Sequence, residues 1–151
     1  MKILALDLGT KTGWACGDIN HKPISSTAIF KNGKNDGDGV RYWKFRQWLL
    51  GIYDLHRFDR VFYESVMNHT GVIASHVYGG LQGVLLSWCE ENKIPYVGVG
   101  VGTIKKHATG KGNADKEAMI QAMVSKGHTP KDDNEADALS LFYYSHDLMR
   151  S

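Results

Sequence analysis

Apolar residues recur along the chain with two spacings, one typical of strands and the other of helices. Short apolar runs bounded by turn residues predict strands at residues 2–8, 13–18, 24–31, 60–64 and 95–99. The first three follow one another with little more than a turn between them, which predicts an antiparallel meander. Residues 32–39, rich in Gly, Asn, Asp and Lys, are expected to form an exposed loop.

Stretches with helical spacing predict the remaining elements. They cover residues 40–56, 71–92, 103–106, 114–125 and a last helix that begins between 130 and 134 and ends near 146. Thr70, Thr103 and Asn113 are the expected N-caps of the second, third and fourth of these helices, because a side-chain oxygen there can accept a backbone N–H.

The helix at 71–92 carries three glycines, Gly79, Gly80 and Gly83. Each costs about 1 kcal/mol relative to alanine in a helix interior. They are explained if they let another backbone come close, either from a neighbouring helix or from a second copy of the protein. The alternative, that isolated glycines are simply tolerated, stays open.

The order of elements predicts an α/β fold. Three strands, then a helix, strand, helix, strand and further helices form a mixed five-stranded sheet, with three antiparallel strands followed by two parallel ones and helices on both faces. This outline resembles an RNase H-like domain. A length of 151 residues fits one such domain, over residues 1–151, and is too short for two.

Composition narrows the function classes only slightly. The chain has 42% apolar residues, which is typical of a globular protein. Its formal net charge of only +2 gives no large excess of positive charge, so any surface that binds nucleic acid must be a local cluster of basic residues. Cys16 and Cys89 lack metal-binding spacing, which favours free thiols in a reducing compartment. No stretch is long and apolar enough for a membrane, and the first strand begins without a signal peptide. We therefore expect a cytoplasmic protein.

Carboxylates recur where predicted elements begin or end. Asp7 ends the first strand, Glu64 ends the fourth, and acids crowd residues 132–137 at the start of the last helix. The first and fourth strands are expected to be neighbours, which brings Asp7 and Glu64 together. Asp137 lies at the edge of an apolar run, where helix-dipole chemistry explains an acid poorly. For Asp7, the alternative is a side chain that caps the turn after its strand.

Converging carboxylates repel one another unless cations lie between them. Oxygen ligands suit Mg²⁺ or Mn²⁺, and paired ions about 4 Å apart can activate water and stabilise a leaving oxygen in phosphodiester cleavage. Asp133 and Asn134 lie one turn before Asp137 on the same helix face. For Asp132, Asp133 and Glu135, a stabilising interaction with the helix dipole is the competing explanation.

A cluster of basic residues lies between the fifth strand and the penultimate helix. The backbone N–H groups of Gly110 and Gly112, next to the start of a helix, favour a phosphate-binding site in this region. The alternative is a solvated loop with ordinary lysines. The cluster consists of Lys105, Lys106, His107, Lys111 and Lys116.

These motifs together resemble the RuvC-type Holliday junction resolvases, in particular the divergent kind that bacteriophages carry. The resemblance rests on Asp7-Leu8-Gly9 with Thr12-Gly13, on Tyr63-Glu64, and on the ordered segments 109–117 and 135–139. It implies an RNase H-like homodimer with two Mg²⁺-dependent active sites, each cutting one strand of a four-way DNA junction. The glycine-bearing helix is the expected dimer contact.

The resemblance also implies roles for single residues. Asp7, Glu64 and Asp137 match metal-binding catalytic carboxylates, with one ion held by Asp7 and the last-helix acids and a second shared by Asp7 and Glu64. Lys105 and Lys116 match lysines near the scissile phosphate, and Lys116 is a further catalytic candidate. Lys106 and Lys111 extend the expected DNA contacts.

Two positions depart from the family pattern. Asn134 stands where the bacterial family has a fourth acid, so either the Asn134 amide oxygen or the Asp133 carboxylate completes the metal site, and the sequence does not choose. Met67 stands where the family has an aromatic wedge that stacks into the opened junction, and it offers no ring. Met67 and Asn68 are weaker candidates for DNA contact, and His69 is expected to be an ordinary loop histidine.

Three alternative functions stay open at this point. The first is a broader branched-DNA endonuclease with the same site and little junction specificity, motivated by Met67. The second is an actin-like phosphotransferase, because Asp7-Leu8-Gly9-Thr10 also resembles a phosphate loop, although such enzymes use two domains. The third is a catalytically silent nucleic-acid-binding factor, which the retained carboxylates disfavour.

Overall fold

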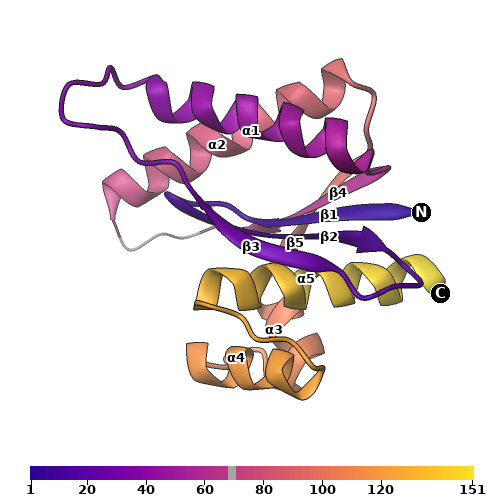
Figure 1. Cartoon of the computed structure of the whole chain (residues 1–151). Coiled ribbons are helices and arrows are strands. Elements are labelled where there is room, and N and C mark those ends of the chain that lie inside the picture. The colour runs from indigo at the N-terminus through magenta and orange to yellow at the C-terminus, as the bar shows by residue number, and fades with distance from the viewer. Residues whose placement is uncertain (68–70) are drawn as a thin grey trace.

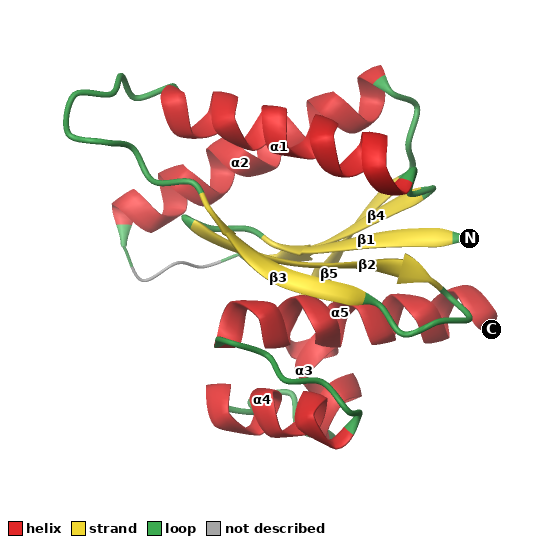
Figure 2. Cartoon of the chain, in the orientation of Figure 1, coloured by secondary structure: helices red, strands yellow, loops and turns green. Residues whose placement is uncertain are grey.

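A mixed sheet with the strand order β3-β2-β1-β4-β5 runs through the computed structural model, which describes residues 1–67 and 71–151. β1, β2 and β3 pair antiparallel, and β4 and β5 run parallel to β1, so the predicted sheet is confirmed (Figure 1, Figure 2). The strands are β1 (Lys2–Asp7), β2 (Lys11–Asp18), β3 (Ile24–Ile29), β4 (Arg60–Ser65) and β5 (Tyr96–Gly100).

Helices cover both faces of the sheet, as predicted. α1 and α2 lie on one face, while α5 lies on the other with α3 and α4 packed beyond it (Figure 1). The helices are α1 (Val40–His56), α2 (Val72–Glu91), α3 (Val101–Thr109), α4 (Lys116–Ser125) and α5 (Asp133–Arg150).

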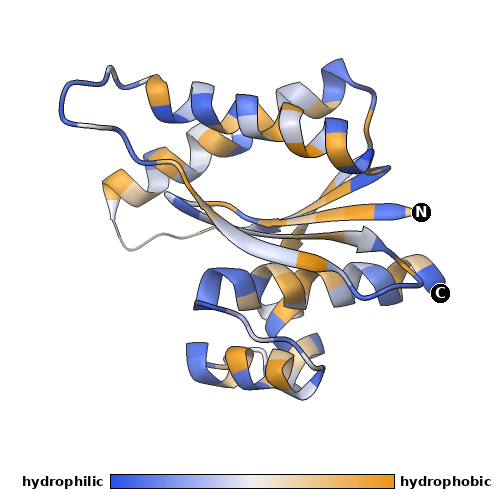
Figure 3. Cartoon of the chain, viewed as in Figure 1, coloured by the Kyte–Doolittle hydropathy of each residue, from blue (hydrophilic) through white to orange (hydrophobic). Residues whose placement is uncertain are grey.

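The central strand β1 is buried on both faces because its side chains alternate between two cores. Leu4 and Leu6 join the core under α1 and α2, whereas Ile3 and Ala5 join the core under α5. β1 is accordingly largely hydrophobic in Figure 3, while the edge strand β3 is paler. Asp7 is the polar interruption that ends this buried strand.

Two predicted helix starts are wrong. α3 begins directly after β5, with Gly100 rather than Thr103 at the N-cap, and it runs on to Thr109. α4 is capped by Asp115 rather than Asn113, because the Asp115 carboxylate accepts the Ala118 N–H at 2.8 Å. The predicted Thr70 cap lies outside the described residues.

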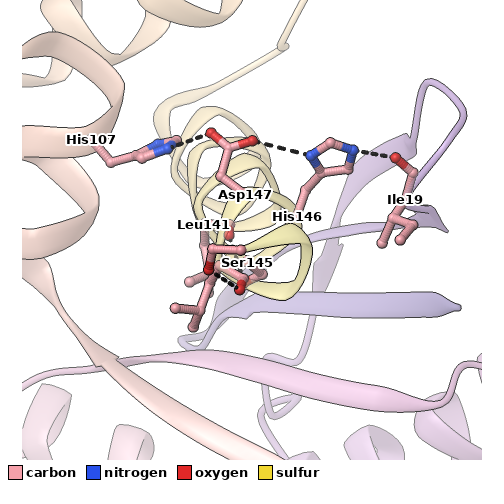
Figure 4. A network of polar contacts seen from close by, with 8 residues as sticks. Ile19, His107, Leu141, Ser145, His146 and Asp147 are labelled. Carbon is pink, nitrogen blue, oxygen red and sulfur yellow. Dashed lines mark hydrogen bonds and ion pairs between the residues drawn. The ribbon is translucent and has the colours of Figure 1, made fainter.

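α5 runs past the predicted end at residue 146 because a polar network holds its last turns (Figure 4). Asp147 accepts from His107 of α3 at 2.8 Å and from His146 at 3.2 Å. The other ring nitrogen of His146 contacts the Ile19 carbonyl oxygen after β2. Asp147 lies ten residues beyond Asp137, about 15 Å along the helix axis. His107 therefore belongs to this network, and its predicted place in a phosphate-binding site stays a prediction.

Of the three α2 glycines, one is explained by packing inside the chain. A Cβ at Gly80 would lie 2.3 Å from Cε1 of Tyr42 on α1, so this glycine lets the two helices approach. At Gly79 and Gly83 an added Cβ would meet nothing within 4 Å. These two positions leave one side of α2 with small residues facing open space.

Both cysteines are free, as predicted, and the structure shows that both are buried. Burial raises the pKa of the Cys16 thiol to about 11 and that of Cys89 to about 12. Both thiols therefore stay protonated and unreactive near neutral pH. Within residues 1–67 and 71–151, no helix combines the length and apolar character needed to cross a bilayer.

Candidate active site

Two carboxylates meet because β1 and β4 are parallel neighbours in register. Leu6 pairs with Tyr63, so Asp7 and Glu64 are the next residues on two adjacent strands. Both therefore lie at the end of the sheet where the parallel strands have their carboxyl ends. The carboxyl ends of parallel strands commonly carry the functional side chains of α/β proteins. The predicted pairing of Asp7 with Glu64 is thus explained by strand order.

The third carboxylate comes from the first turns of α5, which packs across β1 and β2. Asp7, Glu64 and Asp137 can each offer one oxygen so that the three atoms lie within 4.8 Å of one another. All three side chains are half-buried. The structure therefore brings together the three acids that the sequence singled out.

Burial and mutual repulsion raise the pKa values of this triad. Burial, followed by the charges of Glu64 and Asp137, raises the pKa of Asp7 well above its usual range. Burial also raises the pKa of Glu64, against the opposing charge of Lys105. The pKa of Asp137 rises to about 7, first through burial and then through the charge of Glu64. Three carboxylates without a cation are thus held in an unfavourable environment.

A divalent cation fits this donor set. Three carboxylate oxygens in a small volume are the hard ligands that Mg²⁺ and Mn²⁺ prefer. A bound cation would also oppose the upward pKa shifts that burial and neighbouring charge cause here, because it favours the charged carboxylates. Each of the three residues can direct one carboxylate oxygen to the same small volume, so any of them can share a cation with the others.

The remaining acids at the start of α5 divide into two roles. Asp132 is the N-cap and accepts the Glu135 N–H at 2.8 Å, and Glu135 is itself buried. Helix-start chemistry therefore accounts for Asp132 and Glu135. Asp133 lies close enough for its charge to raise the pKa of both Asp7 and Asp137. Whether Asp133 or Asn134 completes a metal site stays a prediction.

The predicted lysines lie at different distances from the carboxylates. The positive charge of Lys105 lowers the pKa of both Glu64 and Asp137, so this lysine acts electrostatically on two of the three carboxylates. Lys116 contacts Asp133 at 3.5 Å while its side chain is 82% exposed, so it can also reach a substrate. Lys106 and Lys111 are exposed. Lys111 lines a pocket of about 430 Å³ at the α3–α4 junction.

Met67 follows β4 and is 87% exposed, at the edge of the sheet where Glu64 lies. The predicted contact residue Asn68 and the loop histidine His69 lie outside the described residues.

Sequence reasoning missed Tyr78 on α2. Its hydroxyl donates to the Glu64 carbonyl oxygen at 2.7 Å and accepts the Val66 N–H at 3.2 Å. These contacts fix the end of β4 around Glu64. In the sequence, Tyr78 is an aromatic residue at helical spacing, which predicts core packing and nothing more.

Gly13 allows α5 to come down onto β2, and replacing it should damage the site. A Cβ there would lie 1.9 Å from the Asn134 carbonyl oxygen, so alanine must push the start of α5 away. We expect Gly13→Ala to lower the free energy of unfolding by about 1–3 kcal/mol, measured by denaturant titration. Gly37→Ala, where an added Cβ meets nothing within 4 Å, is the control. Equal stability of the two variants would contradict the close packing.

The mixed sheet and its clustered carboxylates place the chain in the class of RNase H-like nucleases. No protein-family model matches the chain. The crossover junction endodeoxyribonuclease RuvC of Ehrlichia chaffeensis is 30% identical over 129 residues, covering 83% of this chain and 81% of that protein. The RuvC of Wolbachia pipientis wMel is 28% identical over 148 residues, covering 93% and 91%. The chain belongs to the RuvC family of crossover junction endodeoxyribonucleases.

A solved structure confirms the fold. Thermus thermophilus RuvC in complex with a Holliday junction substrate superposes with a TM-score of 0.80 at 20% identity, over 97% of this chain and 96% of that one. The predicted RNase H-like architecture is therefore confirmed, and the enzyme class is that of the endodeoxyribonucleases.

Proposed function

We propose that this protein resolves four-way DNA junctions by paired, symmetric, metal-dependent phosphodiester cleavage. The observation that carries the proposal is the convergence of Asp7, Glu64 and Asp137, with one oxygen of each within 4.8 Å of the others. The named activity of the family and the junction-bound relative with the same fold support the choice of substrate. Residues 1–151 act as a single nuclease domain in a cytoplasm, and a bacteriophage origin stays a prediction.

The metal site would be held by residues of this chain. Asp7 would be the shared ligand, with Glu64 on one side and Asp137, helped by Asp133 or Asn134, on the other. Two Mg²⁺ ions per site, or Mn²⁺ in their place, supply water activation and charge stabilisation when bound. Asp7 and Glu64 hold their positions because they lie at the ends of two hydrogen-bonded strands, β1 and β4, rather than in a loop.

The lysines would hold the DNA strand at this site. Lys105 and Lys116 lie beside the acids, where they can bind the scissile phosphate and stabilise the charge that develops on it. Lys106 and Lys111 are exposed and extend this basic surface along the DNA backbone. Family membership leaves the phosphotransferase and silent-factor hypotheses without support.

Junction specificity is tested by comparing substrates. We expect purified protein with Mg²⁺ to cut a four-way junction much faster than a three-way junction or a flap of the same sequence. Equal rates on all three would instead support the second candidate, a broader branched-DNA endonuclease, which the ring-free Met67 favours.

Met67→Phe should sharpen the preference for four-way junctions. Base–aromatic stacking is worth about 1–3 kcal/mol, and the exposed position 67 can present a ring to an unpaired base. We expect the four-way to flap ratio of cleavage rates to rise at least about fivefold, which corresponds to the lower end of that range. Met67→Leu, which adds no ring, is the matched control. A ratio unchanged in Met67→Phe would mean that position 67 does not enter the junction.

We also infer that the protein is a homodimer formed through α2. Gly79 and Gly83 leave open space on this helix, and Val72 and Ile73 nearby are 71% and 79% exposed. We expect Gly79→Glu to dissociate the dimer by placing a charge in the contact, as measured by sedimentation velocity. Gly51→Glu, at an open glycine of α1, is the control and should leave the mass unchanged. A Gly79→Glu protein that stays dimeric would exclude this contact.

A further inference from the structure

The edge strand β3 is bonded to the start of α5 through two side-chain hydroxyls. Ser25 donates to Oε2 of Glu135 at 2.7 Å, and Thr27 donates to Oδ1 of Asp132 at 2.8 Å. Ser25 and Thr27 are two residues apart on β3, so their side chains lie on the same face of the sheet. Their acceptors are one helical turn apart on α5.

Both acceptors are carboxylates that also accept backbone N–H groups at the start of α5. Oδ1 of Asp132 also takes the Glu135 N–H at 2.8 Å, and Oε1 of Glu135 takes the Lys131 N–H at 3.0 Å. Glu135 is only 6% exposed, so its charge is costly unless its oxygens are hydrogen-bonded. These bonds keep both carboxylates turned toward β3 and the helix start rather than toward the metal site.

The same bonds determine where the candidate metal ligands lie. A helix is stiff over two turns, so holding residues 132 and 135 also places Asp133, Asn134 and Asp137. Gly13 of β2 packs against the Asn134 carbonyl and prevents α5 from moving closer to the sheet. The two hydroxyl bonds oppose the motions that Gly13 cannot block, sliding along the sheet and lifting away from it.

We propose that Ser25 and Thr27 are positioning residues that hold the start of α5 so that Asp137 and its neighbours meet Asp7 and Glu64. This inference rests on the proposed metal-dependent function. Metal ligands need a supporting shell, and loss of such outer contacts typically weakens metal binding about 10–100-fold. Neither residue touches the substrate or the metal in this account.

The test is Mn²⁺ binding to the DNA-free protein, followed by electron paramagnetic resonance. We expect the double variant Ser25→Ala with Thr27→Val to bind Mn²⁺ at least about tenfold more weakly than wild type. Junction binding without metal should change by less than about twofold, because the basic surface on α3 and α4 is untouched. Thr27→Ser, which keeps the hydroxyl, should bind Mn²⁺ like wild type.

Two controls separate positioning from general stability. Ser26→Ala removes a hydroxyl from the opposite face of β3 and should leave Mn²⁺ affinity unchanged. In Glu135→Gln the amide oxygen can accept the Lys131 N–H while the amide NH2 donates to the Ser25 hydroxyl, so this variant should also retain Mn²⁺ binding, even if the double variant folds poorly. Loss of binding in Glu135→Gln would make Glu135 a ligand and overturn the proposal.

The outcomes also separate this proposal from the proposed function. Wild-type affinity in a folded double variant, or an equal loss in Ser26→Ala, would overturn the positioning role alone. A wild-type protein that fails to bind Mn²⁺ would overturn the metal site itself and the positioning role with it.

Discussion

Asp7→Asn is expected to slow cleavage of a four-way junction about a thousandfold, a loss of about 4 kcal/mol of transition-state stabilisation. Asparagine keeps the size of the side chain but removes one of the three clustered carboxylate charges. Binding of the junction should change little, because the basic residues that contact DNA remain. Single-turnover cleavage and a gel-shift assay measure the two effects separately.

Asp54→Asn is the matched control for this variant. Asp54 is exposed on α1, where it lies near Arg57, and its replacement should leave both cleavage and binding unchanged. Cleavage by Asp7→Asn at the wild-type rate would remove Asp7 from the active site. A loss of junction binding as large as the loss of cleavage would assign Asp7 to substrate binding instead.

Asp137→Asn should stabilise the metal-free protein at neutral pH and above. The pKa of Asp137 rises to about 7 in the folded protein, compared with about 3.9 for an unfolded chain. Below about pH 4 the Asp137 carboxyl group is protonated in both the folded and the unfolded state, so its ionisation does not lower the free energy of unfolding. Between about pH 4 and 7 the unfolded chain releases the proton first, so stability falls as the pH rises through this window. The variant has no such group to ionise.

We therefore expect Asp137→Asn to raise the free energy of unfolding by up to about 4 kcal/mol at pH 8 and by little at pH 4, measured with a chelator present. Mg²⁺ should stabilise the wild type at pH 8 more than it stabilises the variant, because ligand binding to the folded state adds stability. An equal gain at both pH values would mean that the ionisation of Asp137 does not destabilise the metal-free fold.

The sequence predicted the central pair of the site because strand order follows from connectivity. A meander followed by parallel strands places the fourth strand beside the first, and this adjacency alone brings Glu64 to Asp7. Asp137 could be predicted because an acid at the edge of an apolar helical run is poorly explained by the helix dipole. The positions of these three residues follow from periodicity and topology, both of which the sequence carries.

The supporting contacts could not be predicted in this way. Ser25 and Thr27 are small polar residues of an edge strand, and their acceptors lie 110 and 105 residues away in the chain. The hydroxyl of Tyr78 and the carboxylate partner of His107 are likewise set by tertiary packing. The predicted N-cap of α4 was wrong because Asn113 and Asp115 are both residues that cap helices well. Only the geometry of the turn determines that Asp115 is the N-cap.

The most direct test of the account is cleavage of a mobile four-way junction by the wild-type protein, with mapped cut positions and with Mg²⁺ either present or chelated. The account predicts paired nicks at symmetric positions in opposite strands, present with Mg²⁺ and absent without it. Cleavage that persists in the chelator, or an intact junction in Mg²⁺, would contradict a metal-dependent junction nuclease built on Asp7, Glu64 and Asp137.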